Sequence, residues 1–154
     1  MKNLLLTLAL ILGSVQASAR SILPSILVFK EVPAQHVVLE NRDLKSIAVY
    51  ANGDVRAFLG GKVVYSSRVS SARLNYFYEL LEDAAHGKLV RDPKGAFCFT
   101  SSPIENLFIG GSSGETILAR GHFCNGNVFE NDSEAAKILI RILQQLIAEA
   151  FPQR

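Results

Sequence analysis

The residues with the clearest chemical potential form the stretch Gly110-Gly-Ser112-Ser-Gly114, which fits the nucleophile pattern G-x-S-x-G. In enzymes that use this pattern, the serine lies on a sharp turn between a strand and a helix, where its hydroxyl attacks a carbonyl carbon. Here the residues from Glu115 to Phe123 predict a strand after the motif instead of a helix. The context therefore predicts a flexible loop, with a nucleophilic Ser112 as the alternative.

Two cysteines, Cys98 and Cys124, offer the second kind of chemistry. An even number of cysteines in an exported chain favours a disulfide, and both lie at the ends of expected strands, where they can meet. A bridge over such a loop contributes on the order of 3 kcal/mol to stability in the chain-entropy treatment. His122 and Cys124 have the spacing of two ligands on one face of a strand, and Cys98 could add a third. A structural zinc site needs a fourth ligand, and none is evident. We therefore predict a Cys98–Cys124 disulfide, with a free buried thiol or a zinc site as the alternatives.

Other titratable residues show no catalytic spacing. The three histidines lie far apart in the sequence: His36, His86 and His122. Glu82 and Asp83 are neighbouring carboxylates on the expected wet side of a helix, where solvation explains them. No phosphate loop or cofactor motif is present, so the sequence predicts a protein that is not an enzyme and binds no cofactor or metal. The alternative is a small secreted hydrolase assembled from distant residues, with His122, Ser112 and a carboxylate.

The first 19 residues have the three parts of a secretory signal peptide. Lys2 supplies the positive start, Leu4 to Leu12 the apolar centre, and Ala17-Ser-Ala19 the small residues of a cleavage site. The apolar run is too short to span roughly 30 Å of hydrocarbon, and no later segment is suited to crossing a bilayer. We predict cleavage after Ala19, no membrane span in the mature chain, and a periplasmic or secreted protein; a membrane anchor is the alternative.

Length and charge restrict the class of protein. Removing 19 of the 154 residues leaves 135, which is enough for one domain with a core. The full chain has a net charge of +2, and loss of Lys2 reduces it to +1. Nucleic-acid binding needs clustered basic residues, whereas charges of both signs are interspersed here. We therefore expect no nucleic-acid partner.

The region before Lys45 is expected to form an extended arm. Pro24 and Pro33 interrupt an otherwise apolar stretch, and proline disfavours central strand positions. Only a short strand near His36 to Glu40 is expected within it. The predicted divisions are a signal peptide, the arm, a single α+β domain and a short tail: 1–19, 20–44, 45–151 and 152–154.

The stretch from Lys45 to Leu59 predicts a β-hairpin, because an Asn-Gly pair lies at its middle. A two-residue loop would set Val49 opposite Arg56 and mix apolar and charged side chains on one face. A three-residue loop with a left-handed Gly53 sets Val49 opposite Val55 and makes that face continuously apolar. We therefore predict the bulged turn, followed by a third strand near residues 63–65.

The other face of this hairpin carries the candidate partner-binding residues Tyr50, Arg56 and Phe58. Tyrosine and arginine are enriched at binding hot spots because each combines a large contact area with a polar group. Since these three residues share the face opposite the apolar stripe, they indicate a surface for another protein. The alternative is that Phe58 packs under the arm and Tyr50 covers the sheet edge.

Two amphipathic helices are predicted from spacing and caps. The first begins at Ser70 or Ser71, ends near Gly87 and carries this stripe: Leu74, Phe77, Tyr78, Leu81, Ala84 and Ala85. The second follows Asn131-Asp-Ser133, where a glycosylation pattern coincides with the cap, and carries this stripe: Ala135, Leu139, Ile142, Leu143, Leu146, Ile147 and Ala150. Between them we expect three strands: Ala96–Thr100, Ile104–Ile109 and Glu115–Phe123.

The order of elements predicts an α+β fold. An antiparallel sheet is built from two hairpin or meander halves, each followed by an amphipathic helix, in the order β-β-(β)-α-β-β-(β)-α. A compact, disulfide-bonded domain without a catalytic motif is suited to presenting a surface. The predicted function is therefore that of an exported, soluble, non-enzymatic binding module for another protein.

The succession IAVYANGDVRAF, helix LNYFYELLEDA, second hairpin and closing helix resembles the layout of emfourin-type proteins, small inhibitors of thermolysin-like metalloproteases. The resemblance covers roughly Lys45 to Ala150 and is carried by element order and apolar pattern. No inhibitory motif transfers residue by residue, and the arm and the two cysteines are departures from that layout. The resemblance implies the same kind of fold and a protease-inhibitor-like domain.

Overall fold

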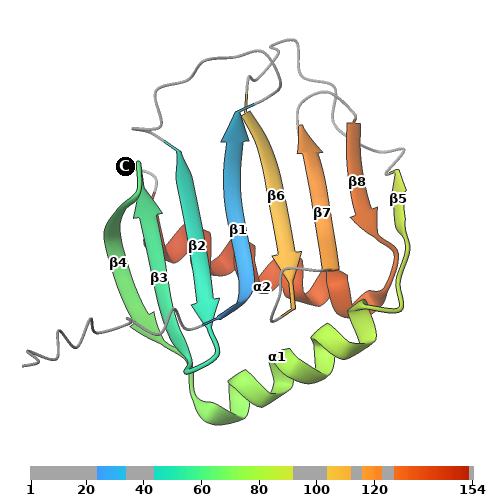
Figure 1. Cartoon of the computed structure of the whole chain (residues 1–154), viewed down its shortest axis with the longest axis horizontal. Helices are drawn as coiled ribbons and strands as arrows, with labels where there is room; N and C mark the ends of the chain where they lie inside the picture. The colour runs from blue at the N-terminus through green and yellow to red at the C-terminus, as the bar shows by residue number, and fades with distance from the viewer. Residues whose placement is uncertain (1–23, 34–43, 92–103, 112–115, 123–126, 153–154) are drawn as a thin grey trace, which may run out of the picture.

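Two groups of four strands, each followed by a helix, make up the described part of the chain (Figure 1). The computed structural model describes residues 24–33, 44–91, 104–111, 116–122 and 127–152. The first group contains β1 (Ser25–Pro33), β2 (Lys45–Tyr50), β3 (Asp54–Leu59), β4 (Lys62–Arg68) and α1 (Ser71–Ala84). The second contains β5 (Leu89–Arg91), β6 (Ile104–Gly110), β7 (Thr116–His122), β8 (Asn127–Asn131) and α2 (Glu134–Ala150). The predicted α+β class, with one helix after each strand group, is confirmed.

All eight strands form one antiparallel sheet in the order β4-β3-β2-β1-β6-β7-β8-β5. β1 lies in its middle and pairs with β2 on one side and β6 on the other. Residues 25–33 of the region expected to form an arm therefore belong to the sheet. Their prolines are compatible with this position, because Pro24 precedes the strand and Pro33 is its last residue. The strand expected near residues 36–40 lies outside the described residues.

The register of the β2–β3 hairpin agrees with the prediction. Val49 pairs with Val55, and Ile47 pairs with Ala57. Gly53 has φ 85°, and its amide donates to the Tyr50 carbonyl at 2.8 Å. This turn places Val49 and Val55 together in the core, where both are fully buried. The predicted third strand is present as β4 and is longer than residues 63–65.

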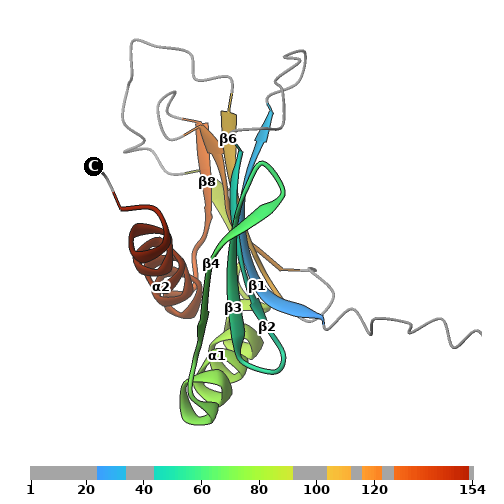
Figure 2. The same cartoon turned by 90° about the vertical axis from the view of Figure 1, so that its left-hand side faces the viewer.

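One face of the sheet has neither helix on it (Figure 2). α2 crosses the opposite face, and α1 lies along the ends of the strands and contacts α2 and β7. The apolar residues between sheet and helices form one core, which includes these fully buried side chains: Leu27, Ile47, Val49, Phe77, Leu118, Leu139 and Leu143. The polar residues predicted outside the α2 stripe are exposed: Lys137, Arg141, Gln144, Gln145 and Glu149.

The predicted stripe of α1 is correct in part. Phe77, Leu81 and Ala84 are buried, but Tyr78 is 41 % exposed, and Leu80, assigned to neither side, is only 7 % exposed. The buried arc is rotated because α1 packs against α2 as well as against β7. The helix begins after Ser70, whose hydroxyl accepts a hydrogen bond from the Arg73 amide at 3.3 Å. It ends at Ala84, so Ala85 belongs to the cap and not to the stripe.

Besides β1, two further strands, β5 and β8, were not predicted. Asn131 was expected to belong to a helix cap, and the residues before it were assigned to no strand. β8 carries only two strongly apolar side chains, Val128 and Phe129. This strand is decided by pairing, because β8 lies between β7 and β5. The α2 cap is Ser133, whose hydroxyl accepts from the Ala136 amide at 3.1 Å, as expected for this region.

Asn131, the last residue of β8, joins the two helices. It is 2 % exposed, its side-chain amide donates to the Ala84 carbonyl at 2.9 Å, and its Oδ1 accepts from the Ser133 amide at 3.0 Å. One side chain therefore satisfies a carbonyl at the end of α1 and an amide at the start of α2.

Several predictions concern parts of the chain that the structure does not describe. They are the signal peptide over 1–19, the strand over 96–100 and the disulfide between Cys98 and Cys124. These stay predictions.

Candidate functional site

The face of the sheet opposite α2 carries a set of side chains that no described helix covers (Figure 2). Successive side chains of a strand point to opposite faces, so the neighbours of the core residues point to this side. We call it the open face and define it by these residues: Val28, Lys30, Val32, Ser46, Ala48, Tyr50, Asp54, Arg56, Phe58, Glu105, Leu107, Ile109, Ile117, Arg120 and Phe129. Most of its apolar members are half-buried.

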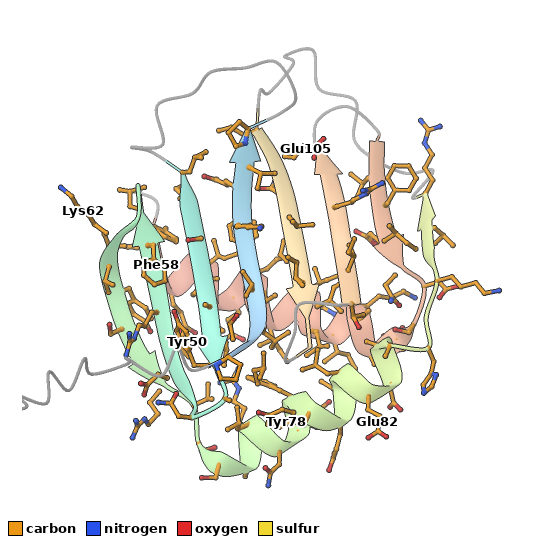
Figure 3. The ribbon with its side chains drawn as sticks, in the orientation of Figure 1. Tyr50, Phe58, Lys62, Tyr78, Glu82 and Glu105 are labelled. Carbon is orange, nitrogen blue, oxygen red and sulfur yellow. The ribbon has the colours of Figure 1, made fainter. Side chains whose placement is uncertain are left out.

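The structure brings the three predicted partner-binding residues, Tyr50, Arg56 and Phe58, to the open face. The guanidinium of Arg56 lies over the Tyr50 ring, 5.3 Å from its centroid. Figure 3, which views this face, shows Tyr50 and Phe58 at different heights along the β2–β3 hairpin. Both rings are half-buried, and Arg56 is exposed. The arrangement is two separate aromatic rings, one of which has a cation stacked on it.

A second cation–aromatic pair lies on the other half of the same face. The guanidinium of Arg120 in β7 is 5.6 Å from the centroid of the Phe129 ring in β8. Neither residue was predicted to belong to a binding surface, because the pairing of β7 with β8 was not predicted. Lys30 was not predicted either, because β1 was assigned to an arm. The continuous apolar run Leu107-Phe108-Ile109 is the sequence feature that could have pointed to this half of the face, because it is typical of a strand with apolar side chains on both faces.

The strand registers arrange the open face in rows that run across the strands. One row joins Phe58, Ser46, Lys30, Leu107, Arg120 and Phe129. The adjoining row joins Arg56, Ala48, Val28, Ile109 and Ile117. A row with two cations therefore lies beside a row that is apolar from β2 to β7.

The open face is hollowed near one end of β1 and β2. A cavity of about 420 Å³ opens there. Its lining consists of Val28, Lys30, Glu31, Leu44, Lys45, Ser46, Gly60 and Gly61. The Glu31 carboxylate accepts a hydrogen bond from the Lys45 amide at 2.7 Å and so fixes one wall. The hollow gives this part of the face a concave surface beside Lys30.

Asp54 is held by charged and polar groups at the hairpin turn. Its carboxylate accepts from Arg68 at 2.7 and 3.0 Å, accepts from the Asn52 side chain at 3.0 Å, and lies 3.6 Å from Arg56. The hydrogen bond from Arg68, followed by that from Asn52, lowers the pKa of Asp54 below its ordinary value. Asp54 therefore holds the side chain of Arg68 in position and only partly neutralises the positive charge of Arg56.

Asp54→Asn is expected to lower the melting temperature near pH 7 but not in strong acid. A carboxylate whose pKa is depressed in the folded state stabilises it above its unfolded pKa of about 3.9, and this stabilisation disappears as the pH falls through the folded pKa. Melting curves of parent and variant from neutral pH to about pH 2 check this. Asp83→Asn, at an exposed position of α1, is the control. A difference that stays constant with pH would contradict the prediction.

The alternative, hydrolytic site stays a prediction, because not all of its residues belong to the described part of the chain. Ser112 and His36 lie outside it, as do both cysteines, and His122 is the last residue of β7. His86 follows α1, and its amide donates to the Asp83 carbonyl at 3.2 Å. Glu82 is exposed on α1. Within the described ranges, no group of three or more His, Cys, Asp and Glu residues has the geometry to hold a metal ion.

The fold and this face define an α+β protein whose sheet has helices on one side only, as far as the chain is described. No protein-family model matches the chain, and neither the curated proteins nor the solved structures contain a significant match. Of the helices in the described segments, none is long and apolar enough to cross a membrane.

Proposed function

We propose that this protein is an exported, non-enzymatic binding module that holds a protein partner on the open face of its sheet. The observation that supports the proposal is that, within the described residues, helices cover only one side of the sheet. The core lies between the sheet and its two helices, while half-buried apolar residues and two cation–aromatic pairs lie on the other side. A contiguous apolar surface on one side of a domain is typical of protein interaction sites.

The composition of the open face favours a protein as the ligand. Tyr50 and Phe58 offer large, rigid contact areas, and Arg56 keeps a charged group stacked on one of them. Tyrosine and arginine are enriched among the few residues that carry most of the binding energy of protein interfaces. The second pair, Arg120 and Phe129, extends the same surface across the sheet. The candidate surface therefore spans the strands from β3 to β8 in the order of the sheet.

The resemblance to emfourin-type inhibitors makes a protease one form that this partner could take. It is carried by element order alone, so the identity of the partner is a matter for experiment. Export, cleavage after Ala19 and the Cys98–Cys124 disulfide belong to the same proposal, since they place the open face in an oxidising compartment.

Photo-cross-linking in the native cell envelope tests the proposal. A photoreactive phenylalanine analogue at Phe58 or Phe129 is expected to trap the partner, because both rings lie on the open face. The same analogue at Gln144, exposed on α2, is the matched control and should trap nothing specific. Cross-links from Gln144 alone, or from none of the three positions, would contradict the proposal.

Side-chain truncation then measures the contribution of the face. Tyr50→Ala or Arg56→Ala should weaken binding of the trapped partner at least tenfold, about 1.4 kcal/mol, without changing the melting temperature. Gln145→Ala, on the exposed side of α2, should leave the affinity unchanged. A partner that binds all three variants as tightly as the parent would remove this face from consideration.

A further inference from the structure

The open face carries more cationic side chains than carboxylates. It carries Lys30, Arg56 and Arg120 together with Asp54 and Glu105. Asp54 is held by Arg68 at 2.7 Å, and Glu105 lies on β6, two residues before Leu107 on the same face. Among the described residues, neither Lys30 nor Arg120 forms an ion pair. The face therefore attracts carboxylates and repels a second copy of itself.

The spacing of two of these cations is set by the sheet. Lys30 on β1 and Arg120 on β7 occupy the same row, with Leu107 of β6 between them. Adjacent strands lie about 4.8 Å apart, so the two positions are separated by about 10 Å across the strands. An α-helix rises about 1.5 Å per residue, and two side chains seven residues apart are therefore about 10.5 Å apart on one side of it. A helix laid along the row would meet both cations with acidic residues at i and i+7 and meet Leu107 with an apolar residue at i+3 or i+4.

The opposite face shows that this sheet accepts a helix in such an orientation. α2 runs across the strands and contacts β1, β2, β7 and β8 (Figure 1). It packs with apolar side chains spaced three and four residues apart, as in Leu139, Leu143 and Leu146. A helix on the open face would complete a sheet covered on both sides, which is a common layer arrangement.

We infer that the partner presents an acidic amphipathic helix, which lies across the strands of the open face with carboxylates two turns apart at Lys30 and Arg120 and apolar residues against Val28, Leu107 and Ile109. This inference rests on the proposed function and specifies the chemistry of the partner. Arg56, in the adjoining row, lies where a further carboxylate on the flank of the helix would reach it.

Selection from a displayed library of helical peptides tests the inference. The peptides are about 18 residues long, roughly 27 Å of helix, with random residues along one side. Asp and Glu should be enriched about threefold or more over the input library, at pairs of positions seven residues apart. Enriched peptides should lose affinity at least tenfold on the Lys30→Gln/Arg120→Gln variant and again when salt rises from about 50 to 500 mM. A central proline should abolish binding.

The matched control removes the same amount of charge elsewhere. Lys137→Gln/Arg141→Gln changes two exposed cations of α2 and should leave peptide affinity unchanged. Equal losses on both double variants, selected peptides without paired acidic residues, or no selected peptides at all would overturn the inference. So would a dimer of the protein, detected by sedimentation, that is lost on Lys30→Gln/Arg120→Gln. If cross-linking at Phe58 still traps a partner in these cases, the binding function stands and only the acidic helix is rejected.

Discussion

Leu143→Ala is expected to lower the free energy of unfolding by about 2 to 5 kcal/mol. Leu143 is fully buried near the middle of α2 and belongs to the core between that helix and the sheet. Truncation removes apolar contacts and leaves a cavity that the sheet cannot close, because β1 and β2 beneath the helix are held by neighbours on both sides. Single domains have roughly 5 to 15 kcal/mol of stability in total, so this one change removes a large share of it.

Thermal and urea unfolding check this prediction. A loss of about 3 kcal/mol corresponds to a fall in melting temperature of about 10 °C for a domain of this size. Gln144→Ala, the next residue along the chain, is the control because its side chain is exposed and the helix tolerates alanine well. Equal small effects of the two substitutions would show that α2 does not supply the core as described.

Asn131→Ala is expected to destabilise the protein by roughly 2 to 4 kcal/mol, because it leaves two backbone groups without partners. The buried side chain donates to the Ala84 carbonyl at 2.9 Å and accepts from the Ser133 amide at 3.0 Å. Asn131→Asp keeps the acceptor for Ser133 but places an oxygen against the Ala84 carbonyl, so it should be as harmful at neutral pH. Asn75→Ala, at an exposed position of α1, should change stability little.

Gly87 offers an independent test of the same contact. A Cβ at this position would lie 2.7 Å from the Asn131 Cγ, closer than two such atoms can approach. Gly87→Ala therefore displaces the Asn131 side chain and should break the same two hydrogen bonds. In a double-mutant cycle, Gly87→Ala and Asn131→Ala together should cost clearly less than the sum of the single effects. Strict additivity in urea unfolding would show that the Asn131 side chain does not carry this stability.

Both predictions concern the covered side of the sheet, whereas the proposed binding residues lie on the other side. This separation makes the functional tests decisive. Arg56 and Arg120 are exposed, so their substitution leaves the core between the sheet and α2 untouched. A loss of binding without a loss of stability would then be assigned to the open face itself.

The turn and cap chemistry of this chain could be predicted because it is local. The bulged turn at Gly53 follows from an Asn-Gly pair and from the alternation of Val49 and Val55, which lie within one hairpin. The caps at Ser70 and Ser133 each bind an amide three residues ahead. The burial of Leu139, Leu143 and Leu146 follows from the helical period of α2, whereas Ala136 and Ile140 are also buried and lay outside the predicted stripe. For the same reason, the grouping of Tyr50, Arg56 and Phe58 on one face could be deduced before the structure was available.

By itself, the sequence determined the α+β class with a helix after each strand group, the β2–β3 register, the regions of the two caps and the grouping of Tyr50, Arg56 and Phe58 on one face. Only the tertiary structure decided that β1 occupies the middle of the sheet, and it thereby placed Lys30 in one row with Arg120 and Phe129. The physical reason is that pairing between strands distant in the chain depends on backbone groups, which every sequence carries alike. β1 is apolar on both faces at Leu27 and Val28 and therefore lacks the alternation that marks a half-exposed strand. β8 has too few apolar residues to show a period at all, and it is a strand because β7 and β5 pair with it on either side.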